Sequence, residues 1–163
     1  MILIIWIARP IRSHNDEQDV WNLFLPDAQY KDCLTHGSKI KVHVYSAIGA
    51  MDCPPAYIRR VVQDESNWSF IGQYWEPPVS YNWKHTAPKR NSGLQIYEAH
   101  VGMAQEAEEV GTFAEFTLNV LPRIANQGYN TVQLMAVMEH PYYGSFGCHV
   151  SNFFAVSSRF GML

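Results

Sequence analysis

The segment from Met138 to Gly161 gathers residue types that could form a functional site. Six aromatic rings, two histidines and three glycines surround a single acid, Glu139. A second acid, Glu98, lies near the end of another strand-like run. Aromatic rings with polar tips can contact a ligand that is apolar on one face and polar at its edges. The segment is therefore the first candidate for a binding site.

The histidines and cysteines give weaker evidence for a functional site. His100, His140 and His149 are isolated, and a lone histidine more often packs or forms a hydrogen bond than catalyses a reaction. The three cysteines lie far apart and form no C-x-x-C pair, which favours reduced thiols over a disulfide framework or a zinc site. We therefore expect no metal and no cofactor, and we expect a cytoplasmic location.

Composition narrows the class of protein. The chain has 163 residues, of which 47% are hydrophobic and 17% charged, and this is enough for one ordinary core or two small ones. A formal net charge of −3 without a long basic run argues against nucleic acid and against an anionic membrane as partners. The apolar opening, MILIIWIA, is shorter than the roughly 20 residues that span a bilayer, and it lacks the marks of a signal peptide. We interpret it as a strand or as a stray start of the reading frame.

The first half of the chain has the pattern of short antiparallel strands. Apolar and polar residues alternate in residues 39–45 (KIKVHVY), as they do in a strand with one buried face. Similar runs, separated by turn-rich stretches, occupy residues 21–25, 56–62 and 68–74. Residues 76–93 are polar and rich in proline, which indicates an extended connecting segment.

The second half predicts a strand, a helix and a second strand. The strand candidates are residues 94–101 and the mostly apolar run 131–138. A helix between them, joined to the second strand by a short turn, makes a βαβ unit with parallel strands.

The helix between these strands has clear boundaries in the sequence. Thr112, followed three residues later by Glu115, predicts a capping box, and Gly128 is the expected residue after its end. Pro122 predicts a kink within the helix. The expected buried face consists of Phe113, Phe116, Val120 and Ile124.

The sequence resembles the glycogen and starch branching enzymes of the α-amylase superfamily. Four stretches together are similar to the start of their catalytic barrel: LQIYEAHVG, VLPRIANQGYN, VQLMAVMEHPYYGSFG and SNFFAVSSRFG. The stretch from about Asp19 to Lys89 is similar to the later part of the β-sandwich carbohydrate-binding module that precedes the barrel. The motif EHPYYGSFG, followed by FFAVSSRFG, is specific to branching enzymes within the superfamily.

The resemblance implies a fold class and a division into domains. It implies an incomplete antiparallel β-sandwich followed by the first βαβ unit of a (β/α)8 TIM-type barrel. Residues 1–12 would be an unmatched apolar leader, residues 13–90 the partial sandwich and its connector, and residues 91–163 the start of the barrel. Because a complete barrel takes on the order of 250 residues, we expect an N-terminal fragment with a truncated barrel.

The resemblance also implies a reaction that this fragment should not perform. Branching enzymes make α-1,6 branches by retaining transglycosylation, which needs two carboxyl groups about 5 Å apart. The family contributes that pair from later strands, so Glu98 and Glu139 do not match it and we expect no catalytic residue here. The alternatives are a stand-alone α-glucan-binding module and a fragment of a related hydrolytic or debranching enzyme.

The resemblance makes the aromatic segment one wall of a cleft for α-glucan, which would be glycogen, amylose or starch. Glu139 and His140 would support the loop. Branching enzymes usually have tyrosine where this chain has Cys148, and a thiol cannot supply the stacking face of a ring. Plain packing of the loop aromatics is the alternative interpretation. The substrate-binding residues would be Tyr142, Tyr143, Phe146, Cys148 and His149.

Other aromatic residues are expected to pack. Phe153 and Phe154 precede a run of small residues and should pack into the barrel wall. Trp68 should lie in the core of the first half. For Trp75 and Trp83 the sequence does not decide between packing in the core and contact with a sugar.

Overall fold

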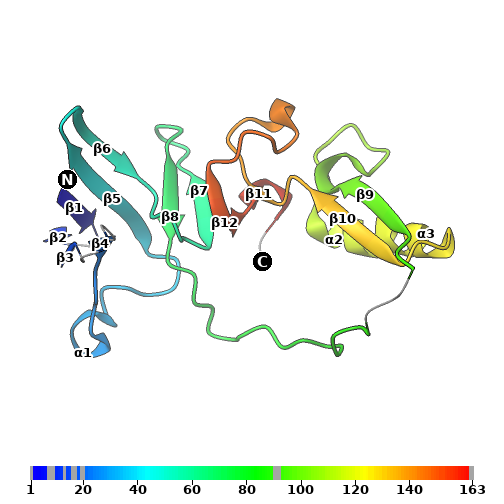
Figure 1. Ribbon diagram of the computed structural model, residues 1–163, viewed down its shortest axis with the longest axis horizontal. Coiled ribbons are helices and arrows are strands. Elements are labelled where there is room, and N and C mark those ends of the chain that lie inside the picture. Colours follow the sequence, from blue (N-terminus) through cyan, green and yellow to red (C-terminus); the bar gives the residue numbers. More distant parts are fainter. Residues whose placement is uncertain are drawn as a thin grey trace. The chain divides into compact units, whose positions relative to one another are not determined.

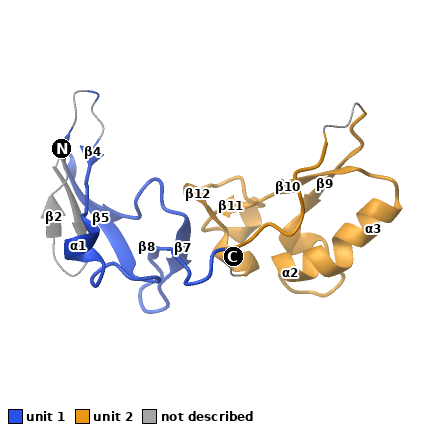
Figure 2. Cartoon of the chain, turned by 90° about the horizontal axis from the view of Figure 1, so that it is seen from below, with its two compact units in different colours: residues 1–80 blue, residues 81–163 orange. Residues whose placement is uncertain are grey.

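The computed structural model describes residues 2–6, 10–12, 14–15, 18, 21–89 and 93–161. The chain divides into two compact units, Met1–Ser80 and Tyr81–Leu163 (Figure 2). The side chains of the apolar opening lie outside the described part, as do residues 90–92 at the expected domain boundary. Among the described residues, no helix is long and apolar enough to cross a membrane.

Unit 1 consists mainly of a six-stranded antiparallel sheet (Figure 1). The strand order is β2-β1-β5-β8-β7, and β6 also pairs with β5. The strands are β1 Ile2–Trp6, β2 Pro10–Arg12, β5 Lys39–Ser46, β6 Gly49–Cys53, β7 Arg60–Gln63 and β8 Phe70–Gln73. A two-residue pair, β3 His14–Asn15 with β4 Trp21–Asn22, and the short helix α1 Asp27–Tyr30 complete the unit.

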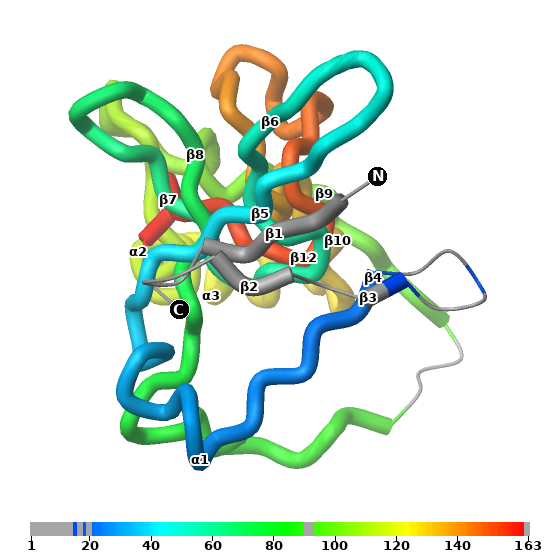
Figure 3. The backbone as a smooth tube through the Cα atoms, turned by 90° about the vertical axis from the view of Figure 1, so that its left-hand side faces the viewer, coloured from blue at the N-terminus to red at the C-terminus, as the bar shows by residue number. Residues whose placement is uncertain are grey.

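The central strand of unit 1 is β5. It pairs with β1 along one edge. Along the other edge it pairs with β8 and then with β6 (Figure 3). Ile40 and Val42 are buried and Val44 is half-buried, so the predicted alternation of β5 is confirmed. The opening residues Ile2–Trp6 form a strand that belongs to this sheet, which confirms their interpretation as a strand.

Two other predicted strands of unit 1 are present but shorter, as β7 and β8, and residues 21–25 form only the two-residue strand β4. The prediction that Trp68 packs in the core is wrong, because its side chain is 72% exposed. Trp68 lies in the tight turn between β7 and β8, with a left-handed φ of 59° and its N–H bonded to the carbonyl of Asp64 at 2.8 Å. This turn directs the ring away from the sheet.

Unit 2 contains the predicted βαβ unit. β9 Ile96–His100 and β10 Thr131–Met135 are parallel and in register from Ile96 opposite Thr131 to His100 opposite Met135. The intervening helix consists of α2 Phe113–Glu115, a π-helical turn η2 Phe116–Val120, and α3 Leu121–Asn126 (Figure 1). The remaining elements are the 3-10 turns η1 Val101–Met103, η3 Tyr143–Ser145 and η4 Ser158–Phe160, and the strands β11 Met138–Glu139 and β12 Asn152–Val156.

The predicted capping box begins this helix. The Thr112 hydroxyl accepts a hydrogen bond from the Glu115 N–H at 3.2 Å, and the Glu115 carboxylate accepts one from the Thr112 N–H at 2.8 Å. Both contacts satisfy backbone N–H groups that have no partner inside the helix. Gly128 follows the helix with a φ of +93°, as the sequence predicts.

The helix accommodates Pro122 by a π-helical turn that directly precedes it. Proline has no N–H to donate, and its ring crowds the carbonyl four residues earlier. In the wider turn, the N–H of Leu121 bonds to the carbonyl of Phe116, five residues back. The irregularity predicted from Pro122 is therefore a π-turn just before the proline.

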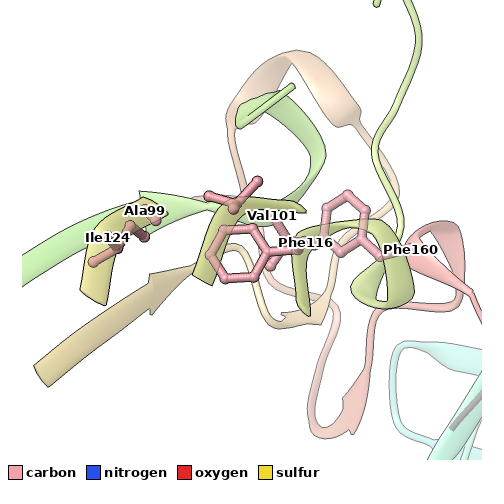
Figure 4. Close-up of a cluster of buried hydrophobic side chains, with 6 residues drawn as sticks. Ala99, Val101, Phe116, Ile124 and Phe160 are labelled. Atoms are coloured by element: carbon pink, nitrogen blue, oxygen red, sulfur yellow. The ribbon is translucent and has the colours of Figure 1, made fainter. Parts of the chain in front are cut away.

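The core of unit 2 joins the helix, β9 and the end of the chain. Phe116 and Ile124 from the helix pack with Ala99 and Val101, and Phe160 from η4 lies at one end of the cluster (Figure 4). The predicted helix face is thus confirmed, with Phe113 only partly buried. A Cβ on Gly102 would lie 2.7 Å from the Phe160 ring, so this close packing requires glycine there.

The second predicted strand breaks before its expected end. Ala136 has a left-handed φ of 59°, which ends β10, and β11 then pairs with β12 instead. The packing predicted for Phe153 and Phe154 is wrong, because both are exposed. On β12 it is Asn152 and Ala155 that face inward.

Candidate functional site

The aromatic loop, defined as residues 140–151, is closed at its base by β11 and β12. The N–H of Ser151 bonds to the carbonyl of Glu139 at 2.9 Å. Just beyond β12, the N–H of Ser157 bonds to the carbonyl of Val137 at 2.8 Å. The two ends of the loop are therefore held together by backbone hydrogen bonds.

The Glu139 carboxylate holds the loop to the turn that follows β12. Its side chain is only 1% exposed. One oxygen accepts a hydrogen bond from the His140 N–H at 3.2 Å, and the other accepts one from the Ser158 N–H at 2.8 Å. These two N–H groups give each oxygen of the buried side chain a hydrogen-bond partner and fix its position.

His140, the first residue of the loop, is fully buried. Its Nδ1 lies 2.9 Å from the carbonyl oxygen of Met138. Because a carbonyl can only accept, Nδ1 is the donor of this hydrogen bond. Within the described part of the chain, Nε2 has no hydrogen-bond partner.

His100, at the end of β9, lies in an aromatic environment beside His140. Burial lowers the pKa of His100 below its usual 6.5, and the neighbouring His140 contributes to the same effect. The imidazole is therefore neutral at pH 7. Its ring has edge contacts, at centroid distances between 5.9 and 6.2 Å, with Tyr143, Phe146 and Phe160.

The tip of the loop turns through two consecutive left-handed residues, Phe146 at φ 54° and Gly147 at φ 83°. A Cβ on Gly147 would lie 2.4 Å from the Cα of Ala136, so the tip rests on the end of β10. The Ser145 hydroxyl donates to the Tyr142 carbonyl at 2.7 Å, and the Cys148 N–H donates to the Ser145 carbonyl at 3.0 Å. These contacts give the tip a defined shape.

Four of the five predicted substrate-binding residues present their side chains at the surface. Tyr142 is 63% exposed and Phe146 47%, and both Cys148 and His149 are exposed. The rings of Tyr142 and His149 lie near each other, with centroids 6.4 Å apart. The fifth, Tyr143, is half-buried and packs against the core of unit 2.

Sequence reasoning did not identify Arg159 as part of this site. Its guanidinium lies 5.5 Å from the centroid of the Tyr143 ring and donates to the carbonyl of Pro141 at 3.2 Å. Arg159 therefore fixes both the start of the loop and its half-buried tyrosine. Residues so far apart in sequence give no local signal of this contact.

The other acid considered from the sequence, Glu98, is exposed on β9 and accepts a hydrogen bond from Gln133 of β10 at 2.9 Å. Gln133 lies directly opposite it in the parallel register. In the part of the chain that the structure describes, no group of three or more histidine, cysteine or acidic residues is arranged to hold a metal ion.

The sequence is similar to curated enzymes over most of its length. It is 47% identical over 154 residues to the 1,4-alpha-glucan-branching enzyme of Dictyostelium discoideum, and the match covers 91% of this chain and 23% of that protein. It is 45% identical over 161 residues to the 1,4-alpha-glucan-branching enzyme of Solanum tuberosum, and the match covers 96% of this chain and 19% of that protein. The chain thus spans about a fifth of the length of these relatives. No family model matches the sequence.

The fold is similar to part of a solved structure, the pullulanase SAP of Group B Streptococcus. The TM-score is 0.69 at 16% sequence identity, and the match covers 98% of this chain and 26% of the pullulanase. The shared features are a mostly-sheet architecture with antiparallel sheets and few helices.

Proposed function

We propose that this chain is a segment of a 1,4-alpha-glucan-branching enzyme and that its aromatic loop binds α-glucan in that enzyme. The whole enzyme would cleave an α-1,4 linkage with retention and transfer the released segment to a 6-hydroxyl. The support is the identity of 42–47% to curated 1,4-alpha-glucan-branching enzymes along nearly the whole chain.

The geometry of unit 2 supports an assignment as the first βαβ unit of a (β/α)8 barrel. β9 and β10 are parallel, as barrel strands are. Leu134 and Met135 on β10 are exposed, although parallel strands are normally covered on both faces. Further barrel elements would cover them. In the same proposal, unit 1 is part of a β-sandwich carbohydrate-binding module.

One observation carries the binding role: Tyr142 and Phe146 are exposed on a loop whose base is fixed by a buried carboxylate. Large exposed aromatic rings on a rigid loop lose little conformational freedom when a ligand binds. Sugar rings have apolar C–H faces that stack on aromatic rings and hydroxyls that suit the tip of tyrosine. In this proposal Tyr142, Phe146, Cys148 and His149 face the glucan, and Tyr143 orients the loop from beneath.

Neither acid of the site suits a catalytic role in this proposal. Retaining hydrolysis and transfer require a nucleophile and a proton donor about 5 Å apart. Glu139 is buried with both oxygens bonded to backbone N–H groups, and Glu98 is bonded to Gln133. The contribution of this chain to the reaction is therefore binding and positioning.

A cytoplasmic location remains part of the proposal. The described cysteines are free thiols, as expected in a reducing compartment. Fractionation of source cells with an antibody to the chain would test it, and recovery with secreted proteins would contradict it.

The test of the loop uses Cys148. Residues 91–163 replace the corresponding segment of a complete branching enzyme, once as they stand and once with Cys148→Tyr. An added ring under the sugar is worth about 1 kcal/mol of stacking. If the ring also positions the reacting sugar, the gain in kcat reaches up to roughly a hundredfold.

We expect the Cys148→Tyr graft to have the higher kcat on amylose, and thermal unfolding of both grafts controls for stability. Equal kcat values at equal stability would mean that residue 148 does not line the cleft. The assignment of the loop to the sugar site would then be withdrawn.

A further inference from the structure

The outer edge of strand β6 has the features of an interaction surface. β6 forms a hairpin with β5 and, among the described strands, pairs with β5 alone (Figure 1). In an antiparallel pair, every second residue of a strand directs its N–H and C=O groups away from its partner. The side of β6 that faces away from β5 therefore presents backbone donors and acceptors to which a further strand can bond.

β6 lacks the features that usually keep an edge strand free of partners. Natural edges are protected by lysine, by proline, by a bulge or by a covering element. The β6 sequence, GAMDC, contains neither lysine nor proline, and its register with β5 is uninterrupted. Of the other two outer strands, β2 contains Pro10 and Arg12, and the first two residues of β7, Arg60 and Val61, are buried. Within the described part of unit 1, β6 is therefore the edge most open to a partner.

Both faces of β6 are exposed, and apolar side chains gather around it. Met51 on one face of the strand is 62% exposed, and Asp52 on the other face is exposed as well. Ile48, in the turn of the hairpin, is 98% exposed, and Tyr45 on β5 is 45% exposed. Apolar surface of this kind beside an open strand edge favours association, because a bound strand would remove it from water.

The β6 sequence is complementary to itself. Two β6 strands related by a two-fold axis run antiparallel, and an axis at Met51 places Ala50 of each strand opposite Asp52 of the other. No like charges face each other in this register, and the Asp52 carboxylate already has a partner in Nδ1 of His43 on β5. The central pair consists of two methionines, whose flexible side chains adapt to close contact.

A second copy of the chain also accounts for the edge completely. In a two-fold pair each copy uses the same surface, so a single contact covers the open edges of both strands and leaves no edge for a third chain. Pairing of β6 with a different strand would instead leave the β6 edge of the other molecule open. The closed pair is therefore the arrangement that the sequence of β6 favours.

We propose that two copies of this chain associate through their β6 strands, antiparallel and centred on Met51, so that the sheets of the two copies of unit 1 become continuous. The proposal rests on the edge of unit 1 alone. It does not depend on the role of the aromatic loop, which belongs to unit 2.

Sedimentation equilibrium of the full chain measures the association over micromolar concentrations, under reducing conditions that prevent disulfides between the free thiols. We expect a monomer–dimer equilibrium. Met51→Lys should raise the Kd of the dimer about tenfold or more, because the symmetry places two lysines opposite each other. The matched control is Val79→Lys, which makes the same change of charge at a 79% exposed apolar residue of unit 1 outside the sheet, and it should leave the Kd unchanged. Because both side chains are exposed, the variants should fold, and circular dichroism verifies this.

Hydrogen exchange locates the contact. As the concentration of the parent chain rises, the β6 amides that point away from β5 should gain protection, whereas those of Met51→Lys should not. A chain that stays monomeric, a dimer whose β6 amides exchange as in the monomer, or a Met51→Lys variant that dimerises as well as the parent chain would each overturn the proposal. Association that continues beyond two copies would overturn the closed two-fold pair.

Discussion

The shape of the aromatic loop depends on a glycine that rests against the end of β10. Gly147 has a φ of +83°, and a Cβ added to it would lie 2.4 Å from the Cα and 2.6 Å from the Cβ of Ala136. These distances are far inside van der Waals contact, and one of the two atoms belongs to the backbone. Gly147→Ala should therefore displace the loop tip, which carries Phe146 and Cys148.

The expected cost has two parts. A non-glycine residue in the left-handed region costs about 1–2 kcal/mol. Forcing an extra methyl group into a packed contact costs about 1–3 kcal/mol. Together they predict that Gly147→Ala lowers the free energy of unfolding by about 2–5 kcal/mol, or by less if the loop moves aside.

Gly128 provides a matched control, because it has a φ of +93° but nothing lies within 4 Å of its added Cβ. Gly128→Ala should lose only the conformational part, so the difference between the variants measures the contact with Ala136. Urea unfolding gives both free energies. Hydrogen exchange at the Cys148 amide, which donates to the Ser145 carbonyl, reports whether the tip has moved. Equal losses in the two variants with unchanged Cys148 protection would mean that the contact of Gly147 with Ala136 does not shape the loop tip.

Four further predictions concern the helix, the buried acid, the histidines and the reaction. Thr112→Ala removes the capping box and should lower the free energy of unfolding by about 1 kcal/mol in urea titration; no loss would mean that the cap is unimportant. Glu139→Gln leaves one of the two backbone N–H groups, that of His140 or that of Ser158, facing an amide NH₂, and should cost about 1–3 kcal/mol. Exchange at one of these two amides should increase, and unchanged exchange at both would contradict the role of the carboxylate. Because burial lowers the pKa of His100, the unfolded chain binds the proton first as pH falls below 6.5, so stability should decline between about pH 7 and pH 5; His100→Gln should flatten this decline, and an equally steep one would argue against it. The purified chain should leave the iodine stain of amylose unchanged, and a sustained change that survives removal of contaminating enzymes would show that it carries a catalytic pair after all.

The features that the sequence predicts correctly are governed by neighbours in the chain. The capping box needs only Thr112 and Glu115, and the buried helix face follows from a spacing that places Phe116 and Ile124 on one side. The alternation in β5 likewise depends on local periodicity. Parallel pairing of β9 and β10 follows from the helix between them.

The features that the sequence does not predict depend on distant partners or on the backbone. Trp68 is exposed because a tight turn gives it a left-handed φ, which overrides its preference for burial. Phe153 and Phe154 are exposed because the inward positions of β12 are taken by other residues. The contact of Arg159 with the Tyr143 ring joins two separate turns, and no periodicity in the sequence links residues of two turns.

The proposed role of this chain, glucan binding within a branching enzyme, can be tested on the reaction product of a chimera. In the 1,4-alpha-glucan-branching enzyme of Dictyostelium discoideum, this chain with Cys148→Tyr would replace the segment to which it is similar. Proton NMR of the amylose product counts the α-1,6 linkages formed. We expect new α-1,6 linkages from the chimera, whereas a folded chimera that forms none, beside an active parent enzyme, would mean that the chain does not have this role.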